Sequence, residues 1–397
     1  MTTDHRVRPS PSTLGPEALN PGRNQRDHEP HGVPPPAREP VVTGSAVADP
    51  AVVERVDGLA GRITLNRPNT LNALTHEMVR LVDAALDRFA GDDAITTIVV
   101  DGTGDRALCA GGDMRSIYEA VRAGHPAPRA FWADEYRLNA RIARYPKPIV
   151  AIMDGIVMGG GVGISAHTSH RVVTERSAVA MPEVGIGFAP DVGGTWLLSH
   201  APGELGTHVA LTARSLGPAD TIEAGLADFH VATSELPTLF AALGHTDAGE
   251  AIAAVTSDPP AGQLAAWRPW IDRTYKADTV EEIVERLLRE GGHAAAAASD
   301  ILAKSPTSLK VALRAIRQAR GLPNLERALE VEYRISTTFL DVPDFVEGVR
   351  AQLIDKDRRP RWNPASLGDV SDAQLEPFFA PRPDDIHLTS PLEATRE

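Results

Sequence analysis

The chain has a single cysteine, Cys109, so an intrachain disulfide framework is excluded and a reducing compartment is favoured. It also lacks any apolar run of the about 20 residues that a membrane-spanning helix needs, so no membrane partner is expected. The N-terminus has no apolar segment of the signal-peptide type. Acidic residues and prolines are scattered through residues 1–30, which is atypical of an organellar transit peptide. We therefore expect a cytoplasmic protein.

Positive charge is scarce as well. The 40 Lys and Arg residues are outnumbered by 53 Asp and Glu residues, and the formal net charge is −13. Nucleic acid is therefore not expected as a partner, because phosphate backbones are bound through a basic surface. A small anionic ligand needs only local positive charge, so the negative net charge does not exclude such a ligand. With 397 residues, 42% of them apolar, the chain can fold as one large domain or two smaller ones.

Composition and periodicity divide the chain into four parts. Residues 1–47 are rich in proline, glycine and arginine and poor in large apolar residues, so we expect a disordered extension. In residues 48–205, short apolar runs alternate with helical spacing, which predicts an α/β core around a parallel sheet. Strand patterns vanish in residues 206–380, which we expect to be helical. Residues 381–397 are polar and proline-rich, and we expect a flexible tail.

The boundaries of individual elements follow from apolar runs and capping residues. Thr75 is the predicted N-cap of the first helix, and Gly91 its predicted end. Strands are predicted at residues 51–57, 61–66, 95–100, 149–153, 172–173 and 179–180. Further helices are predicted at residues 129–145, 280–288 and 325–339.

Two glycine-rich segments, residues 108–113 and 154–163, each lie between a predicted strand and a predicted helix. Glycine lets the backbone approach a ligand closely, and the first turn of a helix leaves N–H groups without partners. Two such segments meeting would form an oxyanion hole from backbone amides. Each segment taken alone is more typical of a tight turn. Neither has the spacing of a dinucleotide-binding motif, and the lysine of a P-loop is missing.

A third segment, residues 181–194, carries Glu183 and Asp191 in glycine-rich, largely apolar sequence. Apolar surroundings raise the proton affinity of a carboxylate, which suits a general base. A structural cap or a surface charge explains Glu183 equally well. For Asp191 the N-cap of a helix is the stronger structural alternative.

Other reactive residue types carry weaker patterns. Cys109 has no activating group beside it and is typical of a core cysteine. His167 and His170 lack a third ligand in a metal-binding pattern. No metal site is therefore expected.

In this order and spacing, the three segments resemble the crotonase (enoyl-CoA hydratase/isomerase) superfamily. The resemblance covers roughly residues 50–380 and is most specific toward the 3-hydroxyisobutyryl-CoA hydrolase subfamily. It implies an α/β fold, a crotonase-like spiral of ββα units with a helical C-terminal region. The stretches that point to the subfamily are residues 211–214, 305–310, 347–350 and 354–357.

The resemblance also assigns roles to individual residues. Gly112 and Gly160 would supply the two oxyanion amides, and Glu183 would be the catalytic carboxylate. Asp191 matches a second acidic catalytic residue of the subfamily, and Glu135 matches a glutamate that contacts the substrate. The remaining substrate-binding residues belong to the loop that cradles the adenine of coenzyme A and to the neighbours of Gly112: Asn72, Ala73, Leu74, Gly111 and Asp113.

One departure from the superfamily pattern separates two chemistries. Hydratases carry two glutamates that position and activate water, and the first would fall at Gly163 in this chain. The pair Glu183 and Asp191 matches the hydrolase subfamily instead. The resemblance thus implies that 3-hydroxyisobutyryl-CoA is hydrolysed to 3-hydroxyisobutyrate and coenzyme A, a step of valine degradation. Glu183 would either attack the thioester carbonyl or activate water.

Two alternatives remain at this point: an enoyl-CoA isomerase or hydratase of the same superfamily, and an acyl-CoA-binding protein without activity. An acyl-CoA thioester is the expected ligand in each case. No cofactor is expected, because coenzyme A is part of the substrate. Superfamily members often form trimers, so a homo-oligomer of that type is a further expectation.

Overall fold

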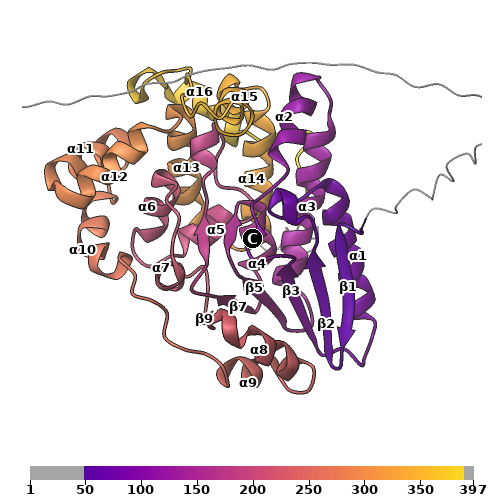
Figure 1. The fold of residues 1–397 in the computed structure, drawn as a ribbon. Coiled ribbons are helices and arrows are strands. Elements are labelled where there is room, and N and C mark those ends of the chain that lie inside the picture. Colours follow the sequence, from indigo (N-terminus) through magenta and orange to yellow (C-terminus); the bar gives the residue numbers. More distant parts are fainter. Residues whose placement is uncertain (1–48, 389–397) are drawn as a thin grey trace, which may run out of the picture. The chain divides into compact units, whose positions relative to one another are not determined.

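The structure, a computed structural model, describes residues 49–388 (Figure 1). The predicted extension of residues 1–47 lies outside the described residues. The described strands form a six-stranded sheet in the order β1-β2-β3-β5-β7-β9 and a three-stranded sheet in the order β4-β6-β8. Their bounds are β1 (Val52–Asp57), β2 (Ala60–Leu65), β3 (Thr97–Gly102), β4 (Ala107–Cys109), β5 (Ile149–Met153), β6 (Ile156–Met158), β7 (His170–Val173), β8 (Ala178–Ala180) and β9 (Phe229–His230).

The two sheets grow together along the chain. Only β1 and β2 are antiparallel; every later pairing in both sheets is parallel. Each of the pairs β3–β4, β5–β6 and β7–β8 adds one strand to each sheet before the chain enters a helix. This repetition is the spiral of ββα units that the sequence predicted. All five residues of β5 are buried, as expected for a strand covered on both faces.

Helices follow the strands and fill the C-terminal half. They are α1 (His76–Ala90), α2 (Met114–Arg122), α3 (Ala127–Ala143), α4 (Gly160–Ser165), α5 (Gly194–Ser199), α6 (Leu205–Thr212), α7 (Pro218–Glu223), α8 (Leu236–Leu243), α9 (Ala248–Ala253), α10 (Leu264–Thr274), α11 (Val280–Glu290), α12 (Gly292–Leu302), α13 (Pro306–Ala319), α14 (Leu325–Phe339), α15 (Pro343–Val349) and α16 (Asp372–Phe379). Over residues 49–388, none of these helices is both long and apolar enough to cross a membrane.

Most sequence-based boundaries agree with the structure. The Thr75 hydroxyl accepts a hydrogen bond from the Met78 amide at 3.2 Å, so Thr75 is the N-cap of α1 as predicted. Strand β3 starts at residue 97, two residues later than predicted. The expectation that residues 206–380 contain no strand was wrong at β9, which pairs with β7. Two residues are too short to produce an alternation pattern, and their strand conformation depends on the neighbouring sheet edge.

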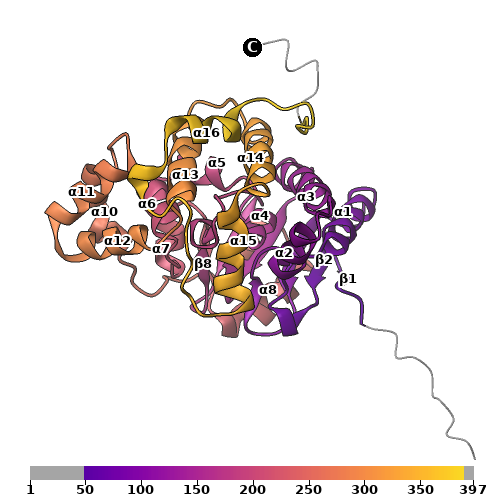
Figure 2. The same cartoon turned by 90° about the horizontal axis from the view of Figure 1, so that it is seen from above.

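The C-terminal helices share the apolar core of the N-terminal part. One continuous cluster of buried side chains runs from β1 to Ile386 and includes residues of α13, α14 and α15. Seen from above, α13 to α16 lie in the foreground over the strands and helices of the first 200 residues (Figure 2). The boundary that we placed at residues 205–206 therefore divides two parts that bury their apolar side chains together.

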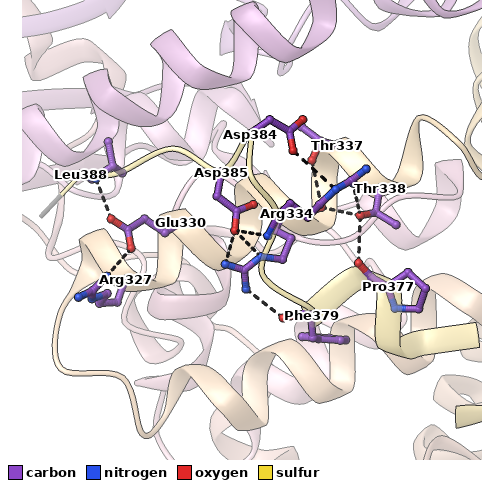
Figure 3. Close-up of polar contacts among 11 residues, drawn as sticks. Arg327, Glu330, Arg334, Thr337, Thr338, Pro377, Phe379, Asp384, Asp385 and Leu388 are labelled. Atoms are coloured by element: carbon purple, nitrogen blue, oxygen red, sulfur yellow. Dashed lines mark hydrogen bonds and ion pairs between the residues drawn. The ribbon is translucent and has the colours of Figure 1, made fainter. Parts of the chain in front are cut away.

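The segment after α16 is held against α14 (Figure 3). The Arg334 guanidinium donates to the Asp385 carboxylate at 2.8 and 2.5 Å, and the Leu388 amide donates to Glu330 Oε1 at 2.7 Å. Arg382 Nη1 donates to the Thr338 hydroxyl at 2.9 Å. Residues 381–388 thus differ from the flexible tail that we expected, because side chains of α14 bind them. The rest of that tail lies outside the described residues.

Candidate active site

A small cavity of about 70 Å³ lies where the two glycine segments meet the turn that carries Glu183. Its wall is mostly apolar and aromatic, with three carboxyl groups among the lining side chains. Such a wall with a few converging polar groups is typical of a small-molecule site. The lining residues are Ala110, Gly111, Gly112, Met114, Phe131, Trp132, Glu135, Met158, Gly159, Gly160, Pro182, Glu183, Ile186, Phe188 and Asp191.

The backbone side of the cavity is formed by the two glycine segments, which approach each other closely. A Cβ atom placed on Gly160 would lie 3.4 Å from the Gly112 nitrogen and 2.6 Å from Glu135 Oε1. One placed on Gly111, whose φ is +103°, would lie 3.2 Å from the Met158 carbonyl oxygen. Within residues 49–388, neither the Gly112 nor the Gly160 amide has a recorded acceptor. Two free N–H groups that border one cavity are the parts of an oxyanion hole.

The predicted adenine loop lies beside this corner. The Leu74 amide donates to the Gly111 carbonyl oxygen at 2.8 Å, and the Asp113 amide donates to the Leu74 carbonyl oxygen at 2.8 Å. The Ala73 carbonyl oxygen accepts from Arg67 Nη1 at 2.6 Å. These bonds hold the loop in register with the first glycine segment. The contact of Ala73 and Leu74 with a ligand stays a prediction.

Two polar side chains next to the corner bond within the protein. Asn72 is buried with φ of +54°, and its amide group donates to the carbonyl oxygens of Thr103 at 3.1 Å and Ala107 at 2.9 Å. The Asp113 carboxylate caps α2 by accepting from the Ser116 amide at 3.3 Å. Both side chains position backbone, so a substrate contact from this loop would come from main-chain groups.

The side-chain face of the cavity is formed by three carboxyl groups from separate segments. Glu135 lies in the middle of α3, Glu183 opens the short 3-10 helix η2 (Glu183–Ile186), and Asp191 lies in the turn before α5. Their exposed fractions are only 2%, 5% and 6%. Within the described residues, Glu135 Oε1 and Glu183 Oε2 are buried without a hydrogen-bond partner. Unsatisfied buried carboxylate oxygens are costly, which marks them as candidates for binding a ligand.

Burial and mutual repulsion shift the proton affinities of this group. Burial, followed by the charge of Asp191, raises the pKa of Glu183 and of Glu135 well above the usual value. Burial also raises the pKa of Asp191 to about 7, although the hydrogen bond from Tyr136 acts in the opposite direction. Carboxyl groups this close cannot all be ionised at neutral pH. Each of the three groups therefore binds its proton more tightly than a free carboxylic acid does.

Sequence reasoning missed the residues that shape this face. The Tyr136 hydroxyl donates to Asp191 Oδ2 at 2.7 Å and lies 2.7 Å from the Ser336 hydroxyl of α14. Phe131 and Trp132 form part of the apolar wall, and Trp132 stacks on Phe188 with ring centroids 5.3 Å apart. Phe131 lies four residues before Glu135, so the helical period could have placed the two on one face. Ser336 lies too far along the chain for any spacing rule.

Position 163 is closely packed. A Cβ atom on Gly163 would lie 2.7 Å from the Val192 Cβ and 2.9 Å from Asn139 Nδ2. Real Cβ atoms essentially never approach other atoms so closely, so any larger side chain forces its neighbours to move. The first glutamate of a hydratase therefore has no space here.

The remaining candidates have structural roles. Cys109 is fully buried, and burial raises its thiol pKa to about 12, which removes it as a nucleophile at neutral pH. His167 Nε2 lies 2.8 Å from the Val192 carbonyl oxygen, and His170 Nδ1 lies 2.9 Å from the Ser169 hydroxyl. Neither histidine is part of a metal-binding group within residues 49–388. The Asp191 side chain bonds Tyr136, while Gly193 is the N-cap of α5, so the expected capping role of Asp191 was not found.

Comparison with known proteins agrees with this geometry. Residues 60–379 match the family model for enoyl-CoA hydratase/isomerase. A protein of Danio rerio named 3-hydroxyisobutyryl-CoA hydrolase, mitochondrial, is 40% identical over 81% of this chain and 87% of its own length. The crystal structure of a carnitinyl-CoA dehydratase from Mycobacterium thermoresistibile is 47% identical, covers 85% of this chain and 98% of its own, and has a TM-score of 0.82. That of an enoyl-CoA hydratase from Rhodobacter sphaeroides is 42% identical over 84% of this chain and 98% of its own, with a TM-score of 0.79. The chain therefore belongs to the enoyl-CoA hydratase/isomerase family, with the crotonase fold that the resemblance implied.

Proposed function

We propose that this protein hydrolyses an acyl-CoA thioester, with 3-hydroxyisobutyryl-CoA as its substrate. The observation that carries the proposal is the packing at Gly163. Val192 and Asn139 fill the space that the first glutamate of a hydratase would need. Glu183 lies beside the amide corner, since a Cβ on Gly159 would lie 3.0 Å from its Oε1, and Glu135 lies there as well. Two amides with Glu183 beside them suit attack on a carbonyl group, whereas the glutamate with which a hydratase positions water is missing at position 163.

In the proposed reaction, the thioester carbonyl oxygen accepts hydrogen bonds from the Gly112 and Gly160 amides. Attack on the carbonyl carbon places negative charge on that oxygen, where the amides stabilise it. Either Glu183 attacks and forms a mixed anhydride that water then opens, or Glu183 removes a proton from the attacking water. In both routes the carbon–sulfur bond breaks and coenzyme A leaves. Glu183 must be ionised, and because burial raises its pKa, hydrolysis should increase as the pH rises above the range in which a glutamate usually titrates.

Asp191 and Glu135 complete the proposed site. Both line the same cavity as Glu183. A 3-hydroxyl group on the acyl chain could donate to an ionised Asp191, and a protonated Glu135 could donate to the same hydroxyl. These contacts would explain a preference for 3-hydroxyacyl over plain acyl thioesters. No cofactor is required, since coenzyme A enters and leaves as part of substrate and product.

Two observations bear on the choice among family activities. The relatives from vertebrates are named hydrolases, whereas the two solved structures are named dehydratase and hydratase. Dehydration of a 3-hydroxyacyl-CoA is therefore the second candidate. It leaves the thioester intact and forms a double bond, so the two reactions give different products from one substrate.

The test is an assay that follows both products from 3-hydroxyisobutyryl-CoA. A thiol reagent reports free coenzyme A, and ultraviolet absorbance reports an enoyl thioester. We expect thiol release without a double-bond signal, and loss of thiol release by at least about 100-fold in Glu183→Gln, which keeps the size but removes the charge. Asp191→Asn should slow the 3-hydroxyacyl thioester more than an unsubstituted one. Enoyl product without thiol would replace the hydrolase by a dehydratase.

Cellular location and assembly are part of this proposal. We keep the cytoplasmic location expected from the sequence, although the vertebrate relatives are named as mitochondrial proteins. Fractionation of cells that express the full chain would decide between them. A homo-oligomer of the trimer type also remains our expectation, and sedimentation of the purified protein would test it.

A further inference from the structure

The turn that carries Asp191 has an unusual backbone. Val192 has φ of +55°, in the left-handed region that β-branched residues rarely enter. Its side chain is buried, with an exposed fraction of 1%. Such a conformation costs about 1–3 kcal/mol and persists only where surrounding contacts enforce it. In this protein, side chains from distant parts of the chain enforce this conformation.

Three side chains from three parts of the fold hold this turn. Tyr136 of α3 donates to Asp191 Oδ2 at 2.7 Å, as described above. His167, which follows α4, contacts the Val192 carbonyl oxygen at 2.8 Å. Glu332 of α14 accepts from the Gly193 amide at 2.6 Å and from the Thr195 amide at 2.8 Å. The backbone on both sides of Val192 is thereby fixed by groups distant in sequence.

The protonation of His167 follows from its partner. A carbonyl oxygen can only accept, so Nε2 must carry the hydrogen. Burial lowers the pKa of His167 to about 4, so the ring is neutral at pH 7 with its proton on Nε2. The contact is therefore a neutral hydrogen bond that does not switch in the physiological range. His167, which the sequence suggested as a weak metal ligand, has a structural partner instead.

Tyr136 differs from the other two because it bonds the carboxylate itself. Its single hydroxyl hydrogen is used on Asp191, so the Ser336 hydroxyl, 2.7 Å away, donates to the tyrosine oxygen. Tyr136 is fully buried on α3, and its hydroxyl contacts α14 through Ser336. The chain Ser336–Tyr136–Asp191 runs from α14 to the cavity. Hydrogen bonds in such a chain strengthen one another when buried.

We infer that Tyr136 is a positioning residue, which with Ser336 holds Asp191 toward the reacting groups and keeps it ionised beside Glu183. This inference rests on the proposed thioester hydrolysis. Asp191 faces ionisable groups from several elements: Glu135 and Tyr136 on α3, Glu183 on η2 and Glu332 on α14. Ionisation of any of the three glutamates would oppose a charge on Asp191, and among these groups only the tyrosine hydroxyl stabilises that charge.

The test compares full-length Tyr136→Phe with the full-length wild-type protein in the thiol-release assay across pH 5–9. Phe keeps the ring and removes the hydroxyl. We expect kcat to fall at least about tenfold while KM changes less than about threefold, and the acidic limb of the pH profile to move to higher pH. The shift follows because a carboxylate that loses a donor binds its proton more tightly. A merely structural role would lower active protein without moving the limb.

Two further variants keep the test decisive. Tyr333→Phe is the matched control, because Tyr333 packs edge-on against Tyr136 at 6.3 Å but its hydroxyl points to the Arg129 carbonyl oxygen. It should leave kcat and the pH profile unchanged. Ser336→Ala should move the acidic limb of the pH profile in the same direction as Tyr136→Phe, but by a smaller amount. If Tyr136→Phe does not fold, the shift in Ser336→Ala tests the role of Tyr136. A wild-type protein that releases no thiol refutes the proposed function; active variants with an unmoved limb refute the role of Tyr136.

Discussion

The two faces of the cavity are built in different ways. The amide face consists of backbone from two glycine segments, both within the first 165 residues, and neighbouring main-chain bonds hold it. The carboxyl face consists of side chains from α3, η2 and the Asp191 turn, and its alignment depends on α14, which comes about 140 residues after Asp191. One face is therefore fixed locally, and the other only after the C-terminal helices have packed. Substitutions should reveal this difference, because the amide face is sensitive to any added atom and the carboxyl face to distant partners.

Gly160→Ala should have the largest effect. The added Cβ would lie 2.6 Å from Glu135 Oε1 and 3.1 Å from Leu74 Cδ1, so these two side chains must move and the lining of the amide corner changes. Loss of one oxyanion donor costs about 2.7–4 kcal/mol in the barrier, so we expect kcat to fall about 10²–10³-fold. Substrate affinity should change much less, because the hole acts on charge that develops in the transition state.

The control for this variant is Gly217→Ala. A Cβ there meets no atom within 4 Å, and the φ of Gly217 is −73°. Its turnover and melting temperature should equal those of the wild type. Steady-state kinetics and thermal melting measure both. A Gly160→Ala enzyme with full kcat would show that this amide does not contact the oxyanion.

The carboxyl face should dominate the pH dependence of stability. Burial raises the pKa of Asp191 from 3.8 to about 7 and that of Glu332 from 4.5 to about 8. The folded protein thus binds protons that the unfolded chain releases above about pH 4. The contribution of these groups is fully present below that pH and is lost as the pH rises through 7 to 8. Since one pKa unit corresponds to about 1.4 kcal/mol, a rise of about 3 units makes the loss on the order of 4 kcal/mol for each group.

Urea unfolding at pH 5, 6.5 and 8 measures this loss. Asp191→Asn removes one titrating group and keeps a similar shape, so its free energy of unfolding should fall less between pH 5 and 8. Asp300→Asn is a suitable control, because Asp300 forms a half-exposed ion pair with Arg214 away from the cavity. If the three proteins lose stability in parallel, the buried carboxyl groups do not cause the pH dependence.

The difference between the amide face and the carboxyl face also explains which site residues could be predicted from the sequence. Gly112, Gly160 and Glu183 lie in short segments whose residue types and order match a family, and the structure brings them to one cavity. Strands such as β5 were predicted to the residue because buried apolar runs carry their own pattern. Ser336 and Glu332 could not be found, because their partners lie in segments about 140–200 residues earlier in the chain. Side-chain contacts across such distances leave no periodic trace in one sequence.

Gly163 lies in the second glycine segment and packs against Val192, which follows Asp191, so Gly163→Ala affects both faces. The new methyl group would press on Val192 and Asn139, which should destabilise the fold by about 1–3 kcal/mol, the usual cost of overpacking. Because Val192 follows Asp191, turnover should fall as well. The double variant Gly163→Ala with Val192→Gly should recover part of the stability, since glycine has no Cβ and therefore removes the closest contact. No recovery would mean that the strain arises at Asn139.

The smallest effect is expected where the C-terminal segment binds the outer side of α14 (Figure 3). Arg334 and Asp385 are 14% and 7% exposed as side chains, and their two hydrogen bonds measure 2.8 and 2.5 Å. Asp385→Ala would leave a mostly buried guanidinium without its carboxylate, at a cost of about 1.5–3 kcal/mol for a hydrogen bond to a charged group.

The neighbouring Asp384 gives the matched control. Its side chain is 55% exposed and pairs with Arg129 at 3.2 Å, and exposed pairs contribute less than about 1 kcal/mol. Thermal melting should therefore show a clear decrease for Asp385→Ala and almost none for Asp384→Ala. Because α14 also carries Glu332 and Ser336, Asp385→Ala should lower kcat about two- to threefold while Asp384→Ala does not. If both variants melt and turn over like the wild type, the C-terminal segment contributes nothing to the alignment of the carboxyl face, and α14 is held by its apolar packing alone.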